Sequence, residues 1–193
     1  MLVISNDCMA GHLYVKYNQI FNHPFMWCVI PYDDMNYMMQ NFHKIHYQNI
    51  TLKPNNYIKK NTVLLTIDNV IRLYAIHLFT NNNKKSIERN GGNLIGPAKE
   101  IYKYASDTYY RRLERMSKVS EDPIFVIHEE LPSSKPSVLR LQYSPYKVFT
   151  LLSKPTIKQH ENHIQIDIPS RQSPHDDMQY LLDAFNTNRI QLP

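Results

Sequence analysis

Glycine is scarce in this sequence, with four residues in 193, and cysteine occurs only twice, as Cys8 and Cys28. Two cysteines cannot build a disulfide framework, and nothing marks the chain as secreted, so both thiols are expected to be reduced. No apolar run approaches the roughly 20 residues that a membrane-spanning helix needs, and the first residues lack the regions of a signal peptide. These absences exclude a disulfide scaffold and a spanning helix, and they predict a cytoplasmic protein.

The motifs of several common enzyme classes are also missing. The sequence has no P-loop, no glycine-rich dinucleotide fingerprint and no Ser-centred nucleophile elbow. It also lacks a broad basic stripe with interleaved aromatic side chains, so no nucleic-acid partner is predicted. The composition that remains is ordinary for a globular protein, at 42% hydrophobic and 20% charged residues. The net charge of +5 favours anionic ligands such as phosphates, nucleotides or lipid head groups, and it leaves peripheral membrane association open.

Short apolar segments alternate with helical patterns along the chain. Strands are predicted at residues 2–4, 25–30, 62–67, 72–79, 124–128, 138–141, 147–152 and 163–168. Helices are predicted at residues 35–42, 97–116 and 174–186. We therefore expect a single α/β or α+β domain over residues 1–193, with a mixed central sheet flanked by helices and an antiparallel meander of the last three strands. Residues 80–97 hold three of the four glycines and are interpreted as a loop insertion.

The polar segment Ser5-Asn6-Asp7-Cys8 directly follows the first predicted strand. Ligands commonly bind where a strand of an open α/β sheet gives way to a loop. A thiol at such a place becomes a nucleophile when a base, a cation or a backbone dipole stabilises its thiolate, because an ordinary pKa of about 8.5 leaves few thiols ionised at neutral pH. A loop held by Asx turns, with a half-buried Cys8, is the alternative. Cys28 lies inside an apolar run and is predicted to belong to the core.

Two histidines are candidate bases for Cys8. His77 is embedded in an apolar run near the end of a predicted strand, while His12 is closer to Cys8 in the sequence. A hydrogen-bonded core histidine is the alternative for His77. His43 and His46 are three residues apart and would share a helix face, but two ligands do not make a metal site, so none is predicted.

Charged clusters offer two further hypotheses. Arg111, Arg112 and Arg115 lie at the end of a predicted helix, where they would clamp a phosphate or simply complement the helix dipole. Asp33 and Asp34 are reminiscent of a metal-dependent glycosyltransferase, although their spacing is not that of the usual acid-any-acid motif. N-capping and dipole complementation of the following helix also explain them.

The order of these features resembles the DUF1919 family of exopolysaccharide biosynthesis proteins. The resemblance covers most of residues 2–152. It is carried by Ser5-Asn6-Asp7-Cys8 with the turn Met9-Ala10-Gly11, by His23-Pro24-Phe25 through Asp34, by Ile76-His77, by Arg111, Arg112 and Arg115, and by the strand at 124–127. Asp7 stands where the family pattern has an amide.

The resemblance implies a transferase in bacterial surface-polysaccharide assembly, such as exopolysaccharide, capsule or lipopolysaccharide, with carbohydrate and an activated sugar or acyl donor as partners. It names no cofactor and no mechanism. From the chemistry, we assign Cys8 as the nucleophile or binding thiol, His77 as the base and Asn6 as an orienting group. The substrate-binding candidates are Ser5, Asp7, His12, Arg111, Arg112 and Arg115. A non-catalytic carbohydrate-binding or assembly protein and a metal-dependent glycosyltransferase stay open as alternatives.

Overall fold

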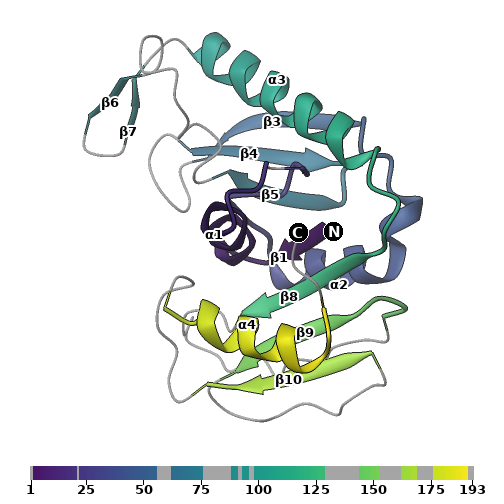
Figure 1. The fold of residues 1–193 in the computed structure, drawn as a ribbon. Coiled ribbons are helices and arrows are strands. Elements are labelled where there is room, and N and C mark those ends of the chain that lie inside the picture. Colours follow the sequence, from purple (N-terminus) through teal and green to yellow (C-terminus); the bar gives the residue numbers. More distant parts are fainter. Residues whose placement is uncertain are drawn as a thin grey trace.

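The computed structural model of the chain describes residues 2–20, 22–55, 62–75, 88–90, 93–95, 98–128, 144–152, 162–168 and 176–190. These residues form four α-helices, two four-stranded sheets and a separate two-stranded sheet (Figure 1). The α/β class predicted from the sequence is therefore confirmed. The strands are divided between a parallel and an antiparallel sheet, where one mixed sheet was expected. No described helix is long and apolar enough to cross a membrane.

The parallel sheet has the strand order β1-β8-β9-β10. Its strands are β1 (Leu2–Ser5), β8 (Pro123–His128), β9 (Val148–Leu152) and β10 (His163–Asp167), and every neighbouring pair is parallel. The predicted antiparallel meander is therefore wrong for β9 and β10. Residues 153–162 connect these two strands, a segment much longer than the tight turn of a hairpin. The strand predicted at 138–141 lies outside the described residues.

The antiparallel sheet has the order β2-β5-β4-β3. Its strands are β2 (Cys28–Val29), β5 (Ile71–Ala75), β4 (Thr62–Ile67) and β3 (Ile50–Asn55). The strand predicted at 25–30 is shortened to β2, because residues 24–27 form a turn. β3 was not predicted. It contains Pro54, and as an edge strand it tolerates a proline, which lacks an N–H.

Two apolar clusters cover the two faces of the parallel sheet. Side chains alternate along β1, so that Leu2 and Ile4 join one cluster and Val3 joins the other. The first cluster packs the sheet against α2 (Tyr32–Asn41), α3 (Ala98–Met116) and the antiparallel sheet. The second cluster packs it against α1 (Met9–Lys16) and α4 (Met178–Thr187). Burial on both faces explains why β1 and β8 are continuous apolar runs.

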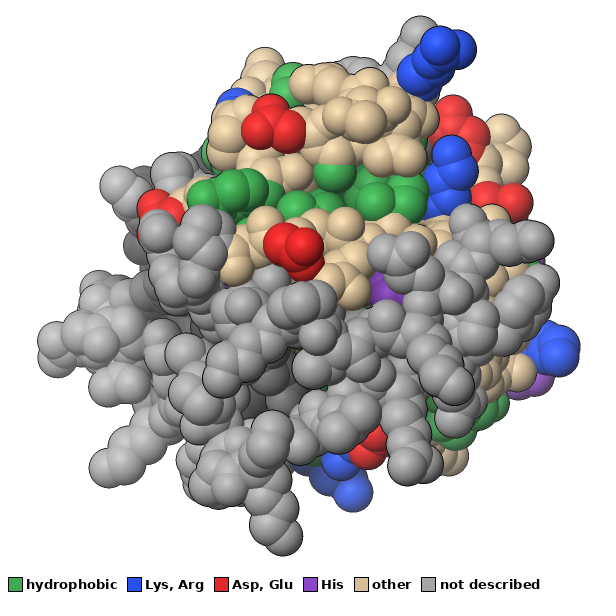
Figure 2. All heavy atoms as spheres, turned by 90° about the horizontal axis from the view of Figure 1, so that it is seen from below, with side chains coloured by type: hydrophobic (Ala, Val, Ile, Leu, Met, Phe, Trp, Pro, Cys, Tyr) green, Lys and Arg blue, Asp and Glu red, His purple; other side chains and the backbone are tan. Residues whose placement is uncertain are grey.

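One edge of the parallel sheet is partly exposed. β1 and β10 are its two edge strands, and the β10 side chains Ile164 and Ile166 are half-buried. Figure 2 views the molecule from below, the side on which β10 lies in Figure 1, and shows a band of hydrophobic side chains across the described surface. Polar side chains and backbone border this band on both sides.

The helices differ from expectation mainly at their starts. α3 ends at Met116 as predicted, and a short 3-10 helix, η1 (Phe42–Lys44), follows α2. α4 begins at Met178 rather than at residue 174, because residues 176 and 177 form a turn. α1 was not predicted. In the segment interpreted as a loop insertion, β6 (Glu88–Asn90) pairs with β7 (Asn93–Ile95) as a hairpin, and the other residues of 80–97 lie outside the described part.

Candidate functional site

The turn after β1 is fixed by its own side chains. Ser5 Oγ donates a hydrogen bond to the Asp7 carbonyl over 2.7 Å and accepts one from the Ala10 N–H over 2.9 Å. Asp7 Oδ1 accepts the Met9 N–H over 2.9 Å. These bonds satisfy N–H groups that the first turn of α1 leaves without a partner inside the helix. Cys8 stands at the helix start, is half-buried and forms no disulfide bond.

Asn6 continues the pairing of β1 with β8 past Ser5, the last residue of β1. Its buried amide donates from Nδ2 to the His128 carbonyl over 2.9 Å, and its Oδ1 accepts the His128 N–H over 2.8 Å. The Asn6 carbonyl also accepts the Ile30 N–H over 2.9 Å. Ser5 and Asn6 therefore hold together three segments at the carboxyl edge of the parallel sheet.

A buried Asp-His-Asp chain closes the same edge. His128 Nδ1 lies 2.7 Å from Asp7 Oδ2, and His128 Nε2 lies 2.8 Å from Asp177 Oδ2. Both distances are those of hydrogen bonds, so each ring nitrogen of His128 is engaged by a carboxylate oxygen. The His128 side chain is 0% exposed and Asp177 is 1% exposed, whereas Asp7 is 12% exposed. This Asp-His-Asp chain links the residues after β1 to β8 and to the start of α4, and it reaches the surface at Asp7.

Sequence reasoning missed His128 and Asp177. His128 was read only as the last residue of a strand, and Asp177 as part of a helix start. Their signal was positional. His128 is the last residue of β8 and Asp7 follows the end of β1, and the ends of two parallel neighbours lie at one edge. This edge is where α/β sheets bind ligands.

The three arginines do not form one clamp. Arg112 is buried, and its Nη1 donates to the Met26 carbonyl over 3.0 Å. Burial lowers the pKa of its guanidinium. Arg111 is exposed and Arg115 is half-buried. Cys28 is fully buried, and burial raises the pKa of its thiol to about 12, which confirms the prediction that it belongs to the core.

The remaining histidine candidates are placed differently. His12 is half-buried on α1, where its N–H bonds to the Cys8 carbonyl over 3.1 Å and its ring meets the Trp27 ring edge-on, with 4.8 Å between centroids. His77 lies outside the described residues. His43 is exposed, and its Nε2 lies 3.5 Å from Asp122 Oδ1.

The acidic pair after Pro31 separates into an exposed and a buried residue. Asp34 Oδ2 accepts from Arg72 Nε over 2.8 Å and from the Arg72 backbone N–H over 2.7 Å, while its Oδ1 accepts from Arg72 Nη2 over 2.8 Å. Both oxygens therefore tie α2 to β5, and Asp33 is exposed. Within the described ranges, no three His, Cys, Asp or Glu side chains are placed to hold a metal ion.

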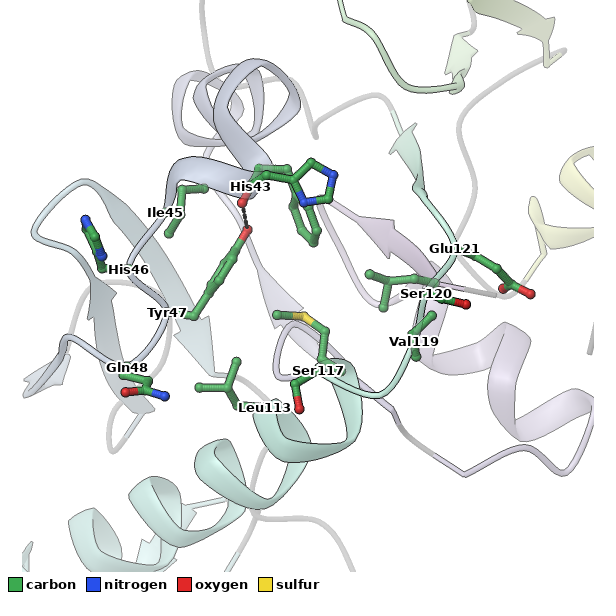
Figure 3. A pocket seen from close by; sticks show the side chains of 13 residues that line it. His43, Ile45, His46, Tyr47, Gln48, Leu113, Ser117, Val119, Ser120 and Glu121 are labelled. Carbon is green, nitrogen blue, oxygen red and sulfur yellow. Dashed lines mark hydrogen bonds between the residues drawn. The ribbon is translucent and has the colours of Figure 1, made fainter.

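A cavity of about 500 Å³ lies at the opposite end of β1, between η1 and the end of α3 (Figure 3). Its wall is held in place by the Tyr47 hydroxyl, which donates to the Phe42 carbonyl over 2.8 Å, and by the Tyr109 hydroxyl, which donates to the Tyr47 carbonyl over 2.7 Å. Apolar side chains that include Leu2 and Met116 line it, with polar groups such as Glu121 at its rim. The cavity contains none of the site residues predicted from the sequence.

The family resemblance is carried by the sequence motifs alone. A scan against protein-family models found no match for this chain, and a search of curated proteins found none either. Membership of the DUF1919 family therefore stays a prediction. The candidate site is accordingly argued from the geometry of the carboxyl edge, where Cys8 and Asp7 are neighbours.

Proposed function

We propose that the chain is a group-transfer enzyme of surface-polysaccharide assembly, with its site at the carboxyl edge of the parallel sheet around Asp7 and Cys8. Two lines of reasoning support this proposal. The edge is the usual ligand-binding place in open α/β sheets, and the turn after β1 is the most motif-like part of the resemblance described above. A transferase needs a nucleophile or a proton acceptor at such an edge, and both residue types stand there.

The observation that carries the proposal is the Asp7–His128–Asp177 chain. Two of its members are buried at 0% and 1% exposure, so His128 and Asp177 have no surface from which to touch a substrate. They are positioning residues. Asp7 is the member at the surface, and its carboxylate is held from behind by His128 over 2.7 Å. A carboxylate fixed in this way is suited to accept a hydrogen bond or a proton from a substrate hydroxyl.

Cys8 supplies the nucleophile in the acyl-transfer form of the reaction. Its thiolate attacks the carbonyl carbon of the donor, so that a C–S bond forms and the bond to the leaving group breaks. A sugar hydroxyl then attacks the thioester, the C–O bond forms, and the C–S bond breaks to return the thiolate. The hydroxyl proton passes to Asp7. His77, predicted as the base from the sequence, stays a second candidate for that step.

The proposal is tested in cells in which variants replace the natural protein. Cys8→Ser and Asp7→Asn are each expected to abolish the surface-polysaccharide product, because they remove the nucleophile and the proton acceptor. Asp33→Asn is the matched control, because it makes the same substitution at an exposed carboxylate outside the Asp7–His128–Asp177 chain. Urea unfolding of the purified variants separates lost chemistry from lost fold. Wild-type amounts of the polysaccharide in Cys8→Ser cells would reject the assignment of Cys8 as the nucleophile.

The same experiment separates the two alternatives. A metal-dependent glycosyltransferase predicts that Asp33→Asn loses activity and that a chelator abolishes it. A non-catalytic binding protein predicts that Cys8→Ser keeps both sugar binding and the polysaccharide product.

A further inference from the structure

Trp27 is the only tryptophan of the chain, and it has an unusual backbone conformation. Its φ is 62°, in the left-handed region that bulky side chains rarely adopt. This conformation costs about 1 to 2 kcal/mol for a residue with a Cβ. Such strain persists only where the surroundings fix it, and it concentrates at functional sites. Trp27 is also half-buried, at the margin of the second apolar cluster.

The turn that carries Trp27 is held on both sides. Before it, the Met26 carbonyl accepts the hydrogen bond from the buried Arg112 over 3.0 Å. After it, Cys28 pairs with Ala75 in the antiparallel sheet, and its N–H bonds back to the Phe25 carbonyl over 3.3 Å. The strained residue is therefore clamped between a buried guanidinium and a strand.

The indole ring of Trp27 lies flat on α1 at Gly11. A Cβ added at Gly11 would stand 2.6, 2.7 and 2.9 Å from Cδ2, Cε2 and Cε3 of the ring. Similar distances to both atoms of the fused bond place Gly11 over a ring face rather than beside an edge. Only glycine permits this approach. The ring of His12, at an interplanar angle of 75°, meets the same indole edge-on.

This contact places the indole about one helical turn from Cys8. Residues three and four positions apart share a helix face, so Cys8, Gly11 and His12 lie on one side of α1. One turn rises about 5 Å, which is comparable to the width of a sugar ring. Asp7 caps the same helix end. A thiol, a carboxylate, an imidazole and an indole are thus grouped at the start of α1.

We propose that Trp27 is the wall on which the pyranose ring of the substrate lies, with the sugar hydroxyls directed to Asp7 and His12. This inference rests on the proposed function and deepens it by naming a pyranose subsite. An indole offers a large, rigid, apolar surface at low entropic cost, which suits the C–H face of a sugar. The carboxylate accepts hydrogen bonds from hydroxyls, and the imidazole donates or accepts them.

The test is saturation-transfer NMR on the full chain with methyl pyranosides of glucose, galactose, mannose and N-acetylglucosamine. The wild type is expected to bind at least one of them, with the strongest transfer to the protons of one ring face. Trp27→Ala should weaken that binding about tenfold, as expected for a buried aromatic anchor. Trp27→Phe should retain most of it. Gly11→Ala should weaken it without removing the indole, because the new Cβ displaces the ring.

Tyr17→Ala is the matched control, since Tyr17 is an exposed aromatic at the far end of α1. Its binding should equal that of the wild type. If Trp27→Ala does not fold, Gly11→Ala decides the question. Binding by Gly11→Ala, and by Trp27→Ala if it folds, that equals wild-type binding would overturn the Trp27 wall and leave the proposed function standing.

Absence of pyranoside binding to the wild type would overturn the wall and the carbohydrate substrate together. Binding of tetramethylammonium in place of the pyranosides would also overturn the wall, because it would assign Trp27 to a cation. The thiol chemistry of Cys8 is read out separately by the polysaccharide product of Cys8→Ser cells. Failure of the sugar subsite is therefore distinguishable from failure of the nucleophile.

Discussion

His23 is expected to make the fold sensitive to mild acid. Its ring is 0% exposed, and His23 Nε2 lies 2.7 Å from the Val3 carbonyl, to which it donates. His23 Nδ1 is buried and has no hydrogen-bond partner among the described residues. Burial, together with the positive charge of Arg112, lowers the pKa of His23 from 6.5 to about 3, although the Val3 contact opposes that shift. The folded state therefore holds the neutral ring.

The sign and size of the effect follow from proton linkage. The pKa of His23 is lower in the folded than in the unfolded state, so its contribution to stability is complete above about pH 6.5 and is lost as the pH falls towards about 3. Each pH unit in that window removes about 1.4 kcal/mol from the free energy of unfolding. The loss has reached about 2 kcal/mol near pH 5.

The matched variant is His23→Gln, whose side-chain amide can donate to the Val3 carbonyl but does not titrate. Urea unfolding, followed by the fluorescence of Trp27, gives the free energy of unfolding of both proteins near neutral pH and near pH 5. All other titrating groups are shared, so their contributions cancel in the difference. The wild type should lose about 2 kcal/mol more than the variant between these conditions. Parallel pH profiles would refute the reasoning.

Three further predictions concern the buried charge pairs and the strained turn. Replacing His128 by Leu should lower the free energy of unfolding, measured in urea, by about 3 to 5 kcal/mol. A double-mutant cycle with Asp177→Leu should show strong coupling between the two residues. Trp27→Gly should be about 1 kcal/mol more stable than Trp27→Ala, because glycine adopts a φ of 62° without strain; equal stabilities would contradict that strain. Asp34→Ala should lower the free energy of unfolding by about 2 to 3 kcal/mol, since three N–H groups lose their acceptor. Asp33→Ala should lower it by less than about 1 kcal/mol in thermal or urea unfolding.

Local patterns predicted those elements whose structure is decided locally. β4 and α3 agree with the sequence, because apolar periodicity marks β4 and Pro97 marks the start of α3. α1 was missed because Gly11 weakens a helical pattern. A glycine stands at this position because the Trp27 ring packs against it, which is a tertiary contact. The parallel order of β8, β9 and β10 was also missed, since strand pairing depends on the path of the connections rather than on each strand.

The candidate site was predicted in part for the same reason. Strand-end position alone singled out Cys8 and Asp7, because polar turn residues directly follow an apolar run. The partners of Asp7 were not predictable from spacing, since His128 lies 121 positions away and Asp177 lies 49 positions beyond His128. Arg112 was expected to face a donor, but it turns inwards to the Met26 carbonyl. The sequence of a helix does not show which of its neighbouring arginines faces the protein interior.

The most direct test of the central claim is a peptide map of the native protein after alkylation by iodoacetamide. The account predicts that Cys8 is modified in the folded protein, because it is half-buried at the start of α1. Cys28 should stay unmodified until the chain is unfolded, because it is fully buried and burial raises its pKa to about 12. Modification of Cys8 only after unfolding would contradict the account, since a thiol that no reagent reaches cannot attack a donor.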